Sequence, residues 1–458
     1  MLRTAQGEEH SFGPLFDRSA LTLSIGTRTE LFGPFMSREL AESGSSITFS
    51  PLFTYHSDLG ADAKELSVVY PILSHKRFGA EYRFQFLQAF SFAGGASSQG
   101  QTNSRFTLFP FYFQQRSSDS NRNYTAVVPL FGHLENRLFR DEVDFVLLPL
   151  YLKTRKRDVT TANYLFPFFH RRQGDGLAGW QLWPLVGMEH KAVTARTNAV
   201  GDIEKVGGHD KTFFLWPFYF NNKLGLGTEN PETQRLLLPL FSAQRSPRRD
   251  STTYFWPLGF TYTHDREKQY REWDAPWPLV VFARGEGKTA NRIWPLFSQA
   301  RNATLESDFY LWPLYKSDRA NSSPLDRRRT RLLLFLYSDL TERNTSTGTA
   351  LERTDLWPLF TARRDHNGNE RLQMFSLIEP LLPASKTVER LYSPLWSVWR
   401  SEKNRSTGAA SQSFLWNLYR REITPTSKKC SLLFGLFHYQ SDPNGTRVRL
   451  FYVPIKKG

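Results

Sequence analysis

The sequence predicts an all-β protein, an antiparallel meander of about 22–24 repeated strands with one strand for each unit of about 20 residues. Three observations predict this fold class. Aromatic residues make up 15% of the 458 residues, and aromatic side chains favour strands. A short apolar motif centred on proline returns along the whole chain at nearly constant spacing. Polar stretches that contain turn-forming residues separate its copies.

The repeated motif reads aromatic-Pro-Leu-aromatic, with Leu or Phe replacing single positions. About 23 copies occur between Pro14 and Pro454, which is the signature of a repeat architecture. In some copies another residue, such as Ser376 or Gly435, takes the place of proline. The residues predicted to form the structural core of the repeat are Pro110, Pro149, Pro167, Trp183, Pro184, Trp216, Pro217, Pro239, Trp256, Pro257, Trp294, Pro295, Trp312, Pro313, Trp357 and Pro358.

Each copy of the motif lies within a short apolar run, as in residues 145–151 and 332–337. A run of about six residues is too short for a helix and is typical of a strand. Between the runs, residues 57–60, 344–348 and 365–368 carry Asn, Asp and Gly. These residues favour tight turns, because they tolerate a positive φ or bond to the backbone. The sequence therefore predicts a strand at each motif and a turn between motifs.

Proline inside a strand needs an explanation, because it cannot donate a hydrogen bond to a neighbouring strand. We favour a bulge or bend at the same place in every strand. The alternative is that the proline ends one short strand and starts the next.

No shift in composition marks a domain boundary, so residues 1–458 are predicted to form a single β-repeat domain. The longest interruption of the repeat, near residues 187–212, is polar and contains glycine. We expect a long loop or a weak extra strand there.

With the motif at the centre of a strand, both faces of that strand are apolar in the middle and polar at the ends. Three arrangements would bury both faces: a closed membrane barrel, a β-propeller, and a solenoid-like array covered by copies of itself. The uniformity of the strands favours equivalent environments, as around a barrel. A closed barrel is therefore the favoured architecture, with the propeller or array as the alternative.

In the spacing of its strands the whole chain resembles the class of bacterial outer-membrane β-barrels, without a motif specific to any family. About 20 residues per strand and turn, and about 22–24 strands, lie within the range of that class. The resemblance implies a location in the bacterial outer membrane or cell envelope and a role in transport, as a channel, or in envelope structure. Two features depart from the class. Six residues extend only about 20 Å, whereas a spanning strand needs about 9–11 residues, and the chain ends in Lys456, Lys457 and Gly458.

The sequence contains no motif of a known catalytic site, and we expect no enzyme, cofactor or metal site. Cys430 is the only cysteine, which excludes a disulfide framework and a cysteine-based metal site. Carboxylates such as Asp58 and Asp365 lie mainly in predicted turns.

The net charge of +15 favours anionic partners. Because the arginines are scattered and form no nucleic-acid-binding module, we expect membrane lipid or anionic lipid head groups rather than a specific nucleic acid. The polar first eleven residues show no signal peptide. The alternative function is a soluble or surface-exposed, propeller-like scaffold for protein interactions.

Overall fold

The computed structural model describes residues 11–96, 102–197, 201, 203–383, 385–443 and 445–455. Strands account for 62% of the residues and helices for 4%. The predicted all-β class and the antiparallel meander are thereby confirmed. The chain divides into two compact units: unit 1 comprises Met1–Ala96 and Pro313–Gly458, and unit 2 comprises Ser97–Trp312. The prediction of one domain stays a prediction.

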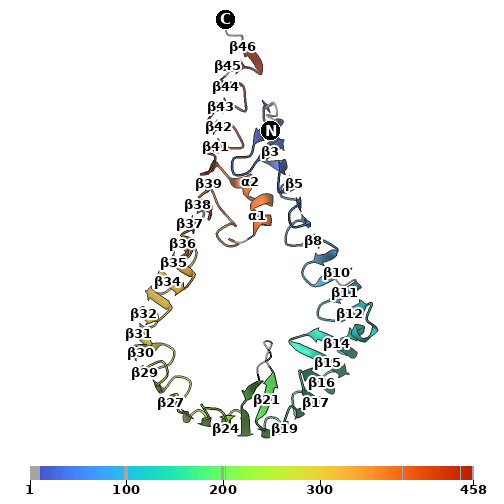
Figure 1. The fold of residues 1–458 in the computed structure, drawn as a ribbon, viewed down its shortest axis with the longest axis vertical. Helices are drawn as coiled ribbons and strands as arrows, with labels where there is room; N and C mark the ends of the chain where they lie inside the picture. The colour runs from blue at the N-terminus through green and yellow to red at the C-terminus, as the bar shows by residue number, and fades with distance from the viewer. Residues whose placement is uncertain are drawn as a thin grey trace. The chain divides into compact units, whose positions relative to one another are not determined.

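Unit 1 contains two runs of consecutive strands and three short helices (Figure 1). Its helices are η1 (Gly33–Phe35), α1 (Lys386–Leu391) and α2 (Ser393–Trp396). Its strands are β1 (Ser11–Phe12), β2 (Phe16–Ala20), β3 (Gly26–Leu31), β4 (Met36–Ala41), β5 (Gly44–Phe49), β6 (Phe53–Asp58), β7 (Ala63–Val68), β8 (Leu73–Phe78), β9 (Glu81–Phe86), β10 (Phe90–Ala96), β34 (Tyr315–Ser322), β35 (Leu325–Leu332), β36 (Tyr337–Asn344), β37 (Ala350–Leu356), β38 (Phe360–Arg364), β39 (Glu370–Met374), β40 (Trp399–Lys403), β41 (Ala410–Phe414), β42 (Tyr419–Ile423), β43 (Lys428–Leu432), β44 (Phe437–Asp442), β45 (Gly445–Leu450) and β46 (Val453–Ile455).

Unit 2 is one uninterrupted run of strands with the 3-10 helix η2 (Ser120–Arg122). Its strands are β11 (Thr102–Leu108), β12 (Tyr112–Ser117), β13 (Tyr124–Val127), β14 (Phe131–Arg137), β15 (Arg140–Val146), β16 (Tyr151–Lys156), β17 (Val159–Tyr164), β18 (Phe169–Gly174), β19 (Leu177–Leu182), β20 (Val186–Lys191), β21 (Thr194–Thr197), β22 (Ile203–Val206), β23 (Gly208–Phe214), β24 (Tyr219–Leu226), β25 (Glu232–Leu237), β26 (Phe241–Arg245), β27 (Arg249–Tyr254), β28 (Phe260–Asp265), β29 (Tyr270–Asp274), β30 (Val280–Gly285), β31 (Lys288–Ile293), β32 (Phe297–Asn302) and β33 (Leu305–Tyr310).

The proline motif forms the turn between two strands and not the middle of one. Strand β19 ends at Leu182, strand β20 begins at Val186, and the motif lies between them. The N–H of Leu185 donates to the carbonyl of Leu182 at 2.8 Å, which closes a tight turn around Pro184. The predicted strand at each motif, and the bulge within it, are therefore wrong, and the alternative that the proline separates two strands is right.

Each unit of about 20 residues consequently supplies two strands, and the predicted number of about 22–24 strands is wrong, since the strands run to β46. The apolar run that suggested a strand consists of the last residue of one strand, the turn, and the first residue of the next. A run of four to eight apolar residues is typical of a buried strand, and its length alone does not reveal a turn inside it.

Successive motif turns are hydrogen-bonded to one another. The N–H of Leu148 donates to the carbonyl of Pro129 at 2.7 Å, and the N–H of Phe166 donates to the carbonyl of Pro149 at 2.7 Å. At the proline position only the carbonyl takes part in this ladder, so the missing N–H of proline costs no hydrogen bond. Because the strands alternate in direction, all motif turns lie along one edge of the sheet, which we call the motif edge.

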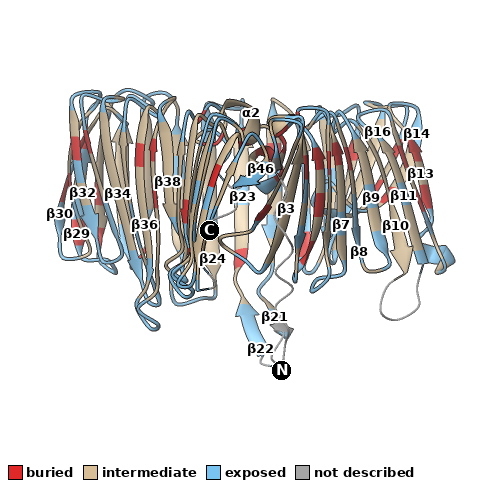
Figure 2. Ribbon diagram, turned by 90° about the horizontal axis from the view of Figure 1, so that it is seen from above, coloured by how far each residue is buried: buried red, intermediate tan, exposed pale blue. Residues whose placement is uncertain are grey.

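The opposite edge, which we call the polar edge, consists of the turns that the sequence predicts between motifs (Figure 2). Asp365 Oδ1 accepts hydrogen bonds from the N–H groups of Asn367 at 2.9 Å and Asn369 at 3.0 Å. Gly368 adopts a φ of 79° in the same turn, which glycine tolerates best. Asn344 Oδ1 likewise accepts from the N–H of Ser346 at 2.9 Å. These predicted turns are confirmed.

The long loop expected near residues 187–212 is largely strand. Strands β20 and β23 pair with each other, with Val186 opposite Phe214 and Lys191 opposite His209. Strands β21 and β22, inserted between them, form a separate two-stranded sheet that projects beyond the polar edge (Figure 2). The polar composition that suggested a loop belongs to an exposed hairpin.

The two faces of the sheet differ in crowding and in chemistry. On the face that carries Leu152 and His170, a Cβ added at Gly132 would lie 2.3 Å from Ala126 Cβ, and one at Gly187 would lie 2.2 Å from Phe213 Cε1. Side chains converge in this way on the concave side of a curved sheet. We call it the inner face, and the opposite side the outer face.

The inner face carries many polar side chains, together with two packed apolar clusters in unit 2. In unit 1 it carries the hydroxyls of Thr54 and Ser67, which are 1% and 0% exposed. The expectation that both faces are apolar at mid-strand is therefore wrong, because it placed the motif at the centre of the strand rather than at its end.

Candidate membrane interface

One continuous row of large apolar side chains follows the motif edge on the outer face of unit 2. Its members are directly opposite one another on consecutive strands. The rings of Tyr151 and Tyr164 lie 5.4 Å apart, and Tyr164 is 47% exposed. We call these residues the outer row: Tyr151, Tyr164, Phe169, Leu182, Val186, Phe214, Tyr219, Leu237, Phe241, Tyr254 and Phe260.

The motif turns extend this apolar surface over the edge itself. The tryptophans before proline, such as Trp216 and Trp256, are nearly half exposed, and so are the residues after it, such as Phe218 and Leu296. The motif turns and the outer row together are called the apolar rim. Contiguous apolar surface of this extent on a chain marks a surface that another apolar phase or partner covers.

Leucines two positions before the proline stand in an unfavourable backbone conformation. Leu147, Leu165, Leu215 and Leu311 have φ values of 45°, 48°, 48° and 47°, and all four are exposed. A leucine with left-handed backbone angles costs about 1–2 kcal/mol, and glycine would adopt them without that cost. Because the side chains gain little burial within the chain, the fold alone does not explain why leucine stands there.

Cationic side chains follow directly behind the rim. Lys153 and Arg235 lie on the outer face two residues from Tyr151 and Leu237 of the outer row. Two residues along a strand correspond to about 7 Å. An apolar layer followed at this distance by positive charge matches the acyl and phosphate layers of a lipid leaflet.

The structure places every residue of the predicted repeat core in the motif turns. They lie together along one edge, as members of one row. None of them is among the buried residues, and most are exposed. Their role as the structural core of the repeat stays a prediction; the structure places them in the turns at the edge of the sheet.

No known family model matches the sequence, and no curated protein is significantly similar to it. Within the described ranges, no helix has the length and apolar character needed to cross a membrane. In the same part of the chain, no group of three His, Cys, Asp or Glu side chains is placed to hold a metal ion.

A second polar feature, in unit 1, joins strands from the two ends of the chain through their inner faces. Asn417, in the turn between β41 and β42, donates to Glu30 of β3 at 2.6 Å, and Arg420 of β42 lies 3.9 Å from Asp17 of β2. Asn404 Nδ2 also donates to the carbonyl of Thr22 at 3.2 Å. We call this contact, together with the charged residues Arg28, Arg371, Arg400, Glu402 and Glu422 around it, the clasp.

Glu402 lies at the centre of the clasp and is buried. Arg400 Nη2 lies 2.6 Å from its carboxylate and Arg371 Nε lies 3.0 Å from it. Burial by itself raises the pKa of this carboxyl, but the guanidinium groups of Arg400 and Arg371 outweigh burial and lower the pKa well below its usual range. Glu402 is therefore ionised at neutral pH.

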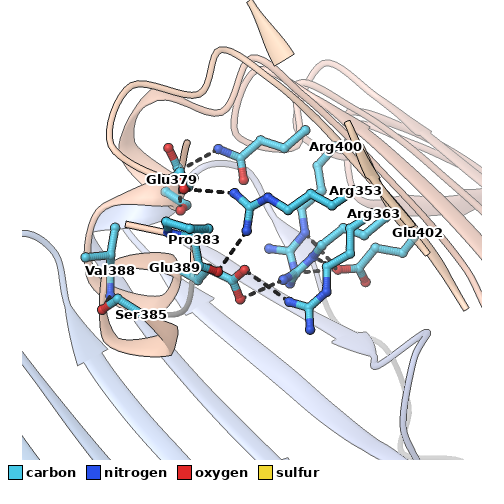
Figure 3. Close-up of polar contacts among 12 residues, drawn as sticks. Arg353, Arg363, Glu379, Pro383, Ser385, Val388, Glu389, Arg400 and Glu402 are labelled. Carbon is cyan, nitrogen blue, oxygen red and sulfur yellow. Dashed lines mark hydrogen bonds and ion pairs between the residues drawn. The ribbon is translucent and has the colours of Figure 1, made fainter. Parts of the chain in front are cut away.

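The segment between β39 and β40 supports the clasp from the inside, where α1 and α2 lie between the N-terminal and C-terminal strands of unit 1 (Figure 1). Val388 and Leu391 of α1 are buried, and Tyr392 donates its hydroxyl to the carbonyl of Tyr70 at 2.7 Å. Residues 375–398 are called the insert. Its carboxylates and carbonyls meet arginines of the sheet (Figure 3).

Glu379 fixes the insert from within. Its carboxylate accepts hydrogen bonds from Gln373 Nε2 at 2.8 Å, Trp396 Nε1 at 3.0 Å and Ser376 Oγ at 3.1 Å, and also from the hydroxyl of Ser393 and the N–H of Ile378. Burial raises its pKa, but these donors outweigh burial and lower it. The carbonyl of Glu379 accepts from Arg353 Nη2 at 2.8 Å, which ties the insert to β37.

His438 lies on the inner face of β44, and its protonation is expected to make the stability of the protein depend on pH. Burial, together with Arg449 and Lys429, lowers its pKa to about 4, although Glu422 opposes them. Since the folded protein then binds a proton less readily than the unfolded chain, stability falls as the pH drops from about 6.5 to about 4. We expect the melting temperature of His438→Gln to fall less than that of the wild type between pH 7 and pH 5. His366→Gln, in an exposed turn of the same unit, is the control and should follow the wild type.

Proposed function

We propose that this protein is a non-enzymatic component of the bacterial cell envelope that enters lipid by its apolar rim and has a structural or transport role there. The observation that carries the proposal is the row of exposed, left-handed leucines. A residue that costs stability and stays about half exposed in the fold indicates a role outside the fold. A lipid phase would cover its side chain.

The height of the sheet defines how deep the rim enters. Strands of about six residues rise about 20 Å, whereas a spanning strand needs about 9–11 residues. The apolar part is shorter still, since it comprises the turns and one row of side chains. We therefore propose that the rim occupies one leaflet, to a depth of about 10 Å, with Lys153 and Arg235 at the level of the phosphates.

We further propose that the sheet closes as a barrel, with its inner face toward water. In this proposal, closure does not depend on backbone pairing between the first and last strands. The clasp, which joins β2 and β3 to β42 through their inner faces, would hold the two ends of the chain together.

The leucines allow a test that separates lipid binding from folding. We expect Leu165→Gly, Leu215→Gly and Leu311→Gly, combined in one chain, to lower partition into vesicles by about tenfold or more, since a buried leucine contributes about 1.5–3 kcal/mol. Stability should change little, because glycine relieves the left-handed strain at these positions. Flotation with vesicles of phosphatidylcholine and phosphatidylglycerol measures the partition, and thermal unfolding measures the stability.

Phe139→Gly is the matched control, because Phe139 is 97% exposed with a φ of 60° but lies at the polar edge. It should float as the wild type does. Quenching of tryptophan fluorescence by lipids brominated at shallow positions, more than by those brominated at deep ones, would support insertion into one leaflet. A wild-type protein that stays in the aqueous phase without detergent would contradict the proposal and favour a soluble interaction scaffold.

A further inference from the structure

The inner face of unit 2 carries both polar and apolar side chains, and an apolar groove follows it from Phe109 to Phe220. The groove has a volume of about 1010 Å³, at the upper end of the range of about 300–1,000 Å³ for ligand sites. Its floor includes Leu134, Val143 and Phe145, which are 2%, 5% and 3% exposed and belong to one packed cluster. Phe213 and Phe220, from strands farther along the unit, complete its walls.

The groove is open to the apolar rim at one end. Phe166, Trp183 and Trp216 line it, and each is the residue before proline in a motif turn. From these turns the lining follows the strands inward: β18 begins at Phe169, and Arg172 lies three residues further along, which corresponds to about 10 Å. An acyl chain in one leaflet extends over half of the hydrocarbon core of about 30 Å. The groove, with the turn residues at its open end, therefore accommodates a large part of one such chain.

The far end of the groove carries positive charge. Arg140 and Arg172 line it together with Thr154 and Thr161, and none of the lining residues is an aspartate or glutamate. Glu189, just outside the lining, binds Arg172 Nη1 at 2.5 Å and accepts from His209 Nε2 at 2.7 Å. The ion pair with Glu189 occupies some of the five N–H donors of Arg172, and the other donors remain for a ligand.

His170, between the apolar and the charged part, adds no charge at neutral pH. Burial, and the positive charge of Arg172, lower its pKa. The groove thus offers an apolar channel followed by a neutral imidazole and two guanidinium groups. This order of surfaces matches a single acyl chain with an anionic head group.

We propose that this groove binds the acyl chain of an anionic lipid, with the head group at Arg172 and Arg140. The proposal rests on the membrane contact proposed above only for the route by which the lipid enters. The chain would pass from the leaflet between the tryptophans of the rim into the groove. Unit 2 would then hold single lipid molecules on its inner face.

The test uses the full chain held in amphipol and measures the displacement of a fluorescent polyene fatty acid by oleate. Thr161→Trp, which fills the groove, should weaken the binding of oleate by about tenfold or more. Thr160→Trp introduces the same side chain at the neighbouring residue, which lies on the outer face. It should bind oleate as the wild type does. Undetectable binding by the wild type, or equal binding by the two variants, would overturn the proposal.

The head group is tested separately. Arg172→Gln should weaken the binding of oleate by about tenfold. The binding of oleyl alcohol, which has no carboxylate, should not change. Arg155→Gln is the control, because Arg155 also forms an ion pair with a glutamate, Glu142, but on the outer face. Equal affinity of the two variants for oleate would overturn the assignment of the head group to Arg172.

The two proposals fail in different experiments. The leucine-to-glycine variant changes residues outside the groove lining, so it should bind oleate normally while it floats poorly. Thr161→Trp should float normally while it binds oleate poorly. Loss of both properties in either variant would contradict the separation of the groove from the rim.

Discussion

Replacing Glu402 with glutamine is expected to lower the free energy of unfolding of unit 1 by about 3–5 kcal/mol, the cost of breaking a buried ion pair from one side. The substitution leaves the half-buried side chains of Arg400 and Arg371 without their shared carboxylate. It preserves the size of the side chain, so loss of packing does not contribute. Urea unfolding followed by tryptophan fluorescence measures the total effect.

Amide hydrogen exchange then locates the effect of Glu402→Gln. Because the clasp joins the two ends of the chain, faster exchange is expected in β3 as well as in β40, although they are far apart in sequence. The control is Glu370→Gln in the same unit, whose ion pair with Arg364 is exposed. An exposed pair contributes about 0–1 kcal/mol. If the two variants lose the same stability, the clasp does not hold unit 1 together.

Replacing Glu379 with alanine is expected to release the insert from the sheet. The change removes an acceptor from several donors, among them Ser376, Gln373 and Trp396. Each buried donor without a partner costs about 1–3 kcal/mol, so we expect unit 1 to lose about 3 kcal/mol or more. Trypsin should then cut after Lys386 and Arg390 of α1, sites that the wild type protects.

Glu379→Gln provides the graded comparison, since an amide oxygen still accepts but its NH₂ group adds donors. Cleavage of this variant should be slower than that of Glu379→Ala and faster than that of the wild type. Identical cleavage of Glu379→Ala and the wild type would show that the insert is held by the apolar contacts of Val388 and Leu391 alone.

The class of the fold and its repeat could be predicted from the sequence because they depend on local features. Aromatic content, motif spacing and the Asn, Asp and Gly of turns such as 344–348 and 365–368 act within a few residues. The number of strands could not be predicted from the apolar run alone. The proline of the motif, as in Trp183-Pro184-Leu185, did indicate a turn. It has no N–H to donate to a neighbouring strand, so it fits a turn better than a strand.

The clasp and the groove on the inner face could not be predicted from the sequence for a different reason. Arg28 and Glu402 contribute to one charged cluster although they are distant in sequence, and in a strand each reads as an ordinary solvated residue. The groove likewise combines Phe145 with Phe213 and Phe220 through the curvature of the sheet. Neither depends on a local pattern, so only the three-dimensional arrangement reveals them.

The ladder that links Pro129, Pro149 and their counterparts through successive turns has a consequence for how such a chain can change. Successive motif turns offer one another one or two carbonyl acceptors of the same kind. A stretch of about 20 residues could therefore be duplicated or deleted without leaving any donor unmatched at the junction. Chains of this design can therefore differ in the number of their strands by two at a time, while the remaining hairpins keep their hydrogen bonds.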